Sequence, residues 1–102
     1  MKKEEISIYI KNENFKVTDH ALEEMDADGF LLGDVIYGII NGEIIEEYPG
    51  SYPLPACLIN SNTPTGEPMH ICISMPPIVK IITVYKPDPN KWENGFKRRK
   101  KK

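Results

Sequence analysis

The stretch Asn41-Gly42-Glu43-Ile44-Ile45-Glu46-Glu47-Tyr48-Pro49 separates two halves of the chain that have different patterns. Before it, apolar residues recur at helical spacing, and after it they form short runs that prolines and glycines interrupt. Gly42 can adopt a positive φ and end a helix there. Glu43–Tyr48 then has the pattern of a strand, which Pro49-Gly50 ends. The order of these patterns predicts helices first and a sheet afterwards.

Up to three helices are expected before this stretch. Residues 4–12 fit two structures, because their isoleucines alternate as in a strand but their apolar residues also lie on one face of a helix. We favour the helix. Thr18 is a good N-cap for a second helix, which Asp26-Ala27-Asp28-Gly29 ends. A third helix is expected at about residues 33–41, and Gly38 within it favours close packing against a neighbour.

Short apolar runs with turn residues between them predict strands in the second half of the chain. Their boundaries are Glu43–Tyr48, Ala56–Asn60, Met69–Met75 and Ile78–Tyr85. The last of these has apolar residues on both faces, as expected for a central strand. The predicted fold class is therefore α+β, with two to three N-terminal helices packed on a C-terminal antiparallel sheet of about four strands.

Charge divides the chain unevenly. It has 102 residues, with 13 Lys and Arg, 15 Asp and Glu and a net charge of −2, but residues 97–102 are all basic. We expect residues 1–96 to form a single acidic α+β domain and residues 97–102 to form a disordered basic tail. The tail could contact RNA phosphates or could simply be solvated.

Two other features bear on location and cofactors. The chain contains no apolar run of the roughly 20 residues that cross a membrane, and its N-terminus does not have a signal-peptide pattern. We therefore predict a cytoplasmic protein that does not bind a membrane, with Cys57 and Cys72 as free thiols. The spacing of the cysteines and histidines argues against zinc, so no metal and no cofactor are predicted.

Five segments resemble, in order, the motifs of one family. The motifs are T-x-H-A-x-x-R-M, D-V with N-G-E-I-I-E-E-Y-P, C-L-I/V, P-L-H-V and T-V-Y-E-P-D-P-x-x-W. The matching segments are Thr18–Met25, Asp34-Val35 with Asn41–Pro49, Cys57–Ile59, Pro68–Ile71 and Thr83–Trp92. On these motifs the chain resembles the bacterial domain-of-unknown-function family 4258. The resemblance implies an α+β fold related to RelE-like and BrnT-like toxins, which are metal-independent ribonucleases.

The resemblance suggests an endoribonuclease that acts on RNA and has an antitoxin as its protein partner. Such cleavage needs an acid, a base and cations. The candidates are His20, His70 and Tyr85 for catalysis, and Lys86, Arg98 and Arg99 for RNA binding. The two histidines occupy motif positions, and each of these three catalytic candidates also fits a structural role.

One position departs from the family pattern: Glu24 stands where the motif usually has Arg. This exchange removes a phosphate-binding cation. It favours the alternative function, a non-catalytic protein-interaction domain that retains the toxin-like fold.

Overall fold

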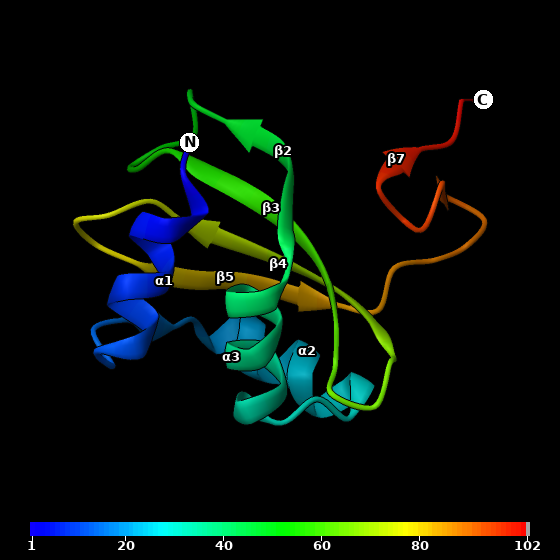
Figure 1. Ribbon diagram of the computed structural model, residues 1–102, viewed down its shortest axis with the longest axis horizontal. Helices are drawn as coiled ribbons and strands as arrows, with labels where there is room; N and C mark the ends of the chain where they lie inside the picture. Colours follow the sequence, from blue (N-terminus) through cyan, green and yellow to red (C-terminus); the bar gives the residue numbers. More distant parts are fainter. Residues whose placement is uncertain (102) are drawn as a thin grey trace.

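The computed structural model describes residues 1–101, in which three helices precede most of the strands (Figure 1). The elements are α1 (Lys3–Lys11), β1 (Lys16–Val17), α2 (Asp19–Asp28), α3 (Leu32–Asn41), β2 (Glu43–Tyr48), β3 (Ala56–Asn62), β4 (Pro68–Ser74), β5 (Lys80–Tyr85), β6 (Trp92–Glu93) and β7 (Arg98–Arg99). The predicted α+β class is confirmed, and so is the choice of a helix for the first segment. None of the described helices is long and apolar enough to span a membrane.

The main sheet has five strands in the order β1-β5-β4-β3-β2. Strands β2 to β5 form the expected antiparallel meander. β1 adds a fifth strand that is parallel to β5, so the sheet is mixed. The sequence pattern did not reveal β1 as a sheet member because a strand of two residues has no measurable periodicity.

The two faces of the sheet have different neighbours. Met69, Ile71 and Ile73 of β4 are fully buried in one core with apolar residues from all three helices. Because side chains alternate along a strand, His70 and Cys72 point to the opposite face. We call this second side the open face, and it also carries Glu46 and Tyr85, which line up with these residues across the sheet.

Two glycines allow α3 to approach the sheet. A Cβ on Gly38 would collide with the side chains of Met69 and Ser61, which confirms the expected close packing. Gly42 ends α3 as expected, but without the positive φ that glycine permits, since its φ is −85° and its ψ −175°. Gly42 is needed for a different reason: a Cβ there would overlap main-chain oxygens of α3 and β3.

Strand β1 is too short to pair with the whole edge of β5. Side chains of α2 and its N-cap form hydrogen bonds with the main-chain groups that β1 leaves unpaired. Three side chains, spaced along the start, middle and end of the helix, contact alternate residues of that edge. They pair Thr18 Oγ1 with Ile82 O at 2.9 Å, Val84 N with Glu24 Oε1 at 3.1 Å and Lys86 N with Asp28 Oδ2 at 3.0 Å. An unpaired sheet edge invites association with other chains. Glu24 therefore has a structural role here, at the position where the family motif has Arg.

The last elements, β6 and β7, form a hairpin that follows the main sheet (Figure 1, orange to red). Its turn has positive φ at three successive residues, Asn94, Gly95 and Phe96. Arg98 and Arg99, which belong to the segment predicted as a disordered basic tail, pair with β6 in this structure. Lys102 lies outside the described residues.

Candidate functional site

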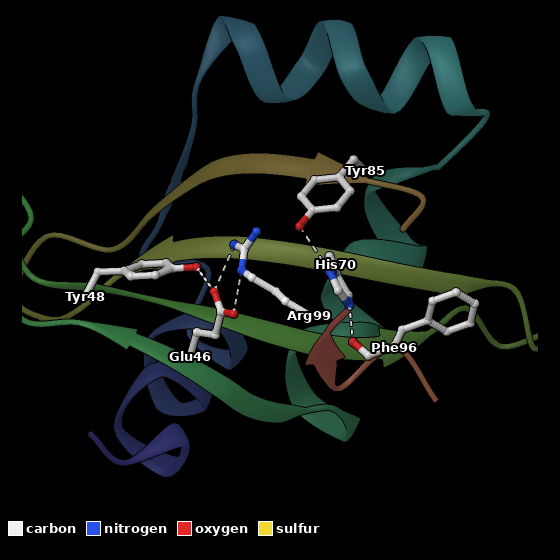
Figure 2. A network of polar contacts seen from close by, with 6 residues as sticks. All are labelled: Glu46, Tyr48, His70, Tyr85, Phe96 and Arg99. Atoms are coloured by element: carbon white, nitrogen blue, oxygen red, sulfur yellow. Dashed lines mark hydrogen bonds and ion pairs between the residues drawn. The ribbon is translucent and has the colours of Figure 1, made fainter. Parts of the chain in front are cut away.

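One row of side chains crosses the open face of the sheet. The strand register places Asn60 opposite His70, and His70 opposite Tyr85. Directly opposed residues in antiparallel strands point to the same face with their Cβ atoms about 5 Å apart. Two of the residues predicted from the sequence, His70 and Tyr85, therefore meet on neighbouring strands, as Figure 2 shows.

His70 is fully buried and uses both ring nitrogens (Figure 2). Its Nε2 lies 2.9 Å from the Phe96 carbonyl oxygen, and its Nδ1 lies 3.0 Å from the Tyr85 hydroxyl. A carbonyl oxygen only accepts hydrogen bonds, so Nε2 must carry the proton in the neutral ring. Nδ1 is then the acceptor, and the Tyr85 hydroxyl donates to it.

The surroundings keep this pair uncharged. Burial lowers the pKa of His70, and the hydrogen bond to Phe96 opposes that effect in part. Burial also raises the pKa of Tyr85. At neutral pH the Tyr85 hydroxyl therefore keeps its proton and presents it to an unprotonated imidazole nitrogen.

We expect the protein to lose stability as the pH falls below 6.5, the ordinary pKa of histidine. Because the pKa of His70 is lower in the folded state, the unfolded chain binds more protons in this range. Stability then falls with decreasing pH, by at most about 1.4 kcal/mol per pH unit for one group. Urea unfolding between pH 5 and 7 measures it. His70→Gln keeps a donor and an acceptor but does not titrate, and an unchanged pH slope in this variant would contradict the assignment.

Arg99 joins the hairpin to the open face (Figure 2). Its guanidinium donates to both Glu46 carboxylate oxygens, at 2.8 and 3.0 Å, and Tyr48 donates to the same carboxylate. Arg99 also lies 4.6 Å above the ring of Trp92, whose centroid is 4.5 Å from that of His70. The two polar groups thus share one aromatic neighbour, Trp92, which is 5% exposed.

This ion pair changes three titrating groups. The Arg99 hydrogen bond lowers the pKa of Glu46, and Glu46 in turn raises the pKa of Arg99. Burial and the bond to Glu46 raise the pKa of Tyr48 to about 12. Glu46 and Arg99 therefore remain charged, and Tyr48 remains protonated, across the neutral range.

The other predicted residues lie apart from this cluster. His20 is 65% exposed on α2 beside the edge of β5, where its Nε2 is 3.3 Å from the Glu24 carboxylate that binds Val84 N. Lys86 follows Tyr85 directly and its Nζ is 3.8 Å from Glu67. Arg98 pairs with Glu93 at 2.7 Å and has an exposed side chain. The two histidines predicted as acid and base have different partners, since His20 contacts Glu24 and His70 contacts Tyr85 and Phe96.

Glu46 and Tyr48 were not among the predicted site residues. Their i, i+2 spacing on one strand places them on the same face, which was the available signal. Their partner Arg99 is 53 residues away from Glu46, so the contact itself had no local signature.

Burial raises the pKa of both cysteine thiols. Both are free thiols on neighbouring strands, with Cys57 in the core and Cys72 on the open face. Burial raises the pKa of Cys57 to about 12, which disfavours the reactive thiolate. Within residues 1–101, no three His, Cys, Asp or Glu side chains are grouped as metal ligands would be.

The sequence of this chain matches one known protein family. Residues 17–86 match the family described as Domain of unknown function (DUF4258). The match covers more than half of the chain, so the protein belongs to this family, as its motifs indicated. No curated protein and no solved structure gave a match. The matched residues contain His70, Tyr85 and Glu46, whereas Trp92 and Arg99 of the hairpin lie beyond them.

Proposed function

We propose that the protein is a cytoplasmic, metal-independent endoribonuclease with a toxin-like fold, and that Tyr85, His70 and Arg99 form its active site. One observation supports this proposal most strongly. The Tyr85 hydroxyl, on a half-buried side chain of the open face, donates its proton to Nδ1 of a neutral, buried imidazole. This is the arrangement of a tyrosine that can accept a proton while passing its own to a base.

In this mechanism an RNA 2′-hydroxyl gives its proton to the Tyr85 oxygen as the Tyr85 proton moves to His70 Nδ1. The 2′ oxygen attacks the adjacent phosphorus, and the bond from phosphorus to the 5′ oxygen breaks. Solvent protonates the leaving 5′ oxygen, and the imidazolium later returns its extra proton to solvent. The products are a 2′,3′-cyclic phosphate and a 5′-hydroxyl, and no metal takes part.

Arg99 and Lys86 supply positive charge for the phosphorane. Arg99 uses two of its N–H donors on Glu46, and a guanidinium has five donors. The remaining donors are available to a phosphate oxygen next to Tyr85. Lys86 follows Tyr85 in the chain and has a half-exposed ammonium group. His20 has no role in this site.

Cleavage of a mixed RNA pool, with metals chelated, tests the proposal. We expect wild-type protein to cleave and Tyr85→Phe to be slower by about 100-fold or more, because the relay loses its hydroxyl. Tyr52→Phe is a matched control, since Tyr52 is 93% exposed and is not a hydrogen-bond partner of Tyr85, His70 or Arg99. His20→Ala should also cleave normally. Absence of cleavage by wild-type protein, or full activity in Tyr85→Phe, would overturn the proposal.

A second function has one observation in its favour. Arg99 is already neutralised by Glu46, and the hairpin carbonyl of Phe96 already occupies His70 Nε2. These contacts would suit a non-catalytic domain that binds a protein partner, such as an antitoxin, through its acidic surface. If this second function is correct, the protein should not cleave RNA even at high protein concentration. It should instead capture a protein partner, and Glu47→Lys should weaken that capture.

A further inference from the structure

A polar pocket of about 420 Å³ lies where α3 meets β2, beside the candidate active site. Its size is within the range of small-molecule sites, about 300 to 1,000 Å³. The lining residues come from α3, β2, β3 and the turn of the hairpin. They are Tyr37, Asn41, Gly42, Glu43, Asn60, Ser61, Asn62 and Lys97. The motif Asn41-Gly42-Glu43, which divides the two halves of the sequence, therefore forms one wall.

The lining is rich in carboxamides. Each Asn side chain offers two donors and an acceptor with two lone pairs. Asn41 spends one N–H on the Tyr37 carbonyl, and Asn60 spends one on the Gly95 carbonyl. The side chain of Asn62 is exposed at the end of β3. The pocket can thus offer donors and acceptors together to a bound molecule.

An aromatic ring completes the lining. Tyr37 is 42% exposed, so part of its ring is accessible to a planar group. Lys97 pairs with Glu43 at 2.7 Å at another part of the pocket. An aromatic face beside several hydrogen-bonding amides is how proteins recognise unstacked nucleobases in single-stranded RNA.

The register fixes the position of the pocket relative to the candidate active site. Asn60 and Tyr85 both lie opposite His70, on the strands that flank β4. They are two strand spacings apart, which is about 10 Å. A strand of RNA that places a phosphate at Tyr85 and a base one or two nucleotides away in the pocket therefore passes over the hairpin turn, whose Gly95 and Phe96 carbonyls contact Asn60 and His70.

From these observations we propose that the pocket binds one unpaired RNA base and gives the protein a base preference. The ligand class is a planar heterocycle with mixed donors and acceptors, attached to the RNA backbone. This inference rests on the proposed function, because it takes RNA as the substrate. It assigns the amides of Asn62 and Asn41 to base recognition and the ring of Tyr37 to stacking.

The test measures binding, so it does not depend on cleavage. Fluorescently labelled oligomers of A, C, G and U, equal in length, are titrated into Tyr85→Phe protein. We expect one base to bind at least about fivefold more tightly than the weakest. Asn62→Ala should reduce this preference. Tyr37→Leu should weaken binding of the preferred oligomer by at least about fivefold. Asn14→Ala is the control, because Asn14 is exposed between α1 and β1.

The outcomes separate the two proposals. Equal binding of all four oligomers, no binding, or a preference that Asn62→Ala and Tyr37→Leu both leave unchanged would overturn the base pocket. If wild-type protein cleaves RNA but shows any of these binding results, the nuclease proposal stands and the base pocket is rejected. If the preference and its loss in the variants are found but wild-type protein does not cleave, the pocket stands and the nuclease proposal fails.

Discussion

Replacing Gly42 with alanine is expected to lower the free energy of unfolding by about 3 kcal/mol. The new Cβ would lie 2.5 Å from the Gly38 oxygen and 2.7 Å from the Asn60 oxygen. Both atoms belong to the main chain, and the Gly38 oxygen already accepts a hydrogen bond from Gly42 N. Relief of the overlap would therefore require the last turn of α3 to distort and to move away from β3. Urea unfolding measures the loss.

Two other glycines calibrate this result. Gly50→Ala should be close to neutral, because no atom lies within 4 Å of its Cβ position and its φ is not positive. Gly38→Ala should fall between, since the overlapping atoms are ends of flexible side chains, Met69 and Ser61. A Gly42→Ala protein as stable as Gly50→Ala would show that α3 is not held in this close approach.

Local signals in the sequence were sufficient for most of the fold. Thr18 was predicted as an N-cap, and its Oγ1 does accept a hydrogen bond from Ala21 N. The alternation in β4 correctly separated Met69 and Ile71 from His70. These features depend on residues within one element. The reason for Gly42 was missed because the atoms that exclude a Cβ come partly from β3, about 18 residues later in the chain.

The candidate site was only partly predictable. His70, Tyr85 and Arg99 were each expected to be functional, but composition and motifs gave no register between strands. Their meeting depends on the pairing of β4 with β5 and on the packing of the hairpin. The run of basic residues resembled a solvated tail because the partners of Arg99, which are Glu46 and Trp92, both lie outside the run in the sequence. Charge runs carry no information about such contacts.

The hairpin should depend on Trp92 more than on any ion pair. Trp92→Ala removes a ring that is 5% exposed and touches both His70 and Arg99. Loss of a buried Trp typically costs about 3 kcal/mol or more. The ion pairs of the hairpin are exposed and contribute less, about 0 to 1 kcal/mol each. We therefore expect the hairpin to open locally while β4 and β5 remain folded.

Amide hydrogen exchange distinguishes local from global unfolding. Lys100 N donates to the Lys91 carbonyl across the hairpin, and its exchange should accelerate by about 100-fold in Trp92→Ala, as 3 kcal/mol implies. The amide of Ile71 in β4 should remain better protected than that of Lys100 in both wild-type protein and Trp92→Ala. Trp92→Phe retains an aromatic ring and should show a smaller change. Equal protection of Ile71 and Lys100 would contradict local opening and would make Trp92 part of the global core, because both segments would then unfold together.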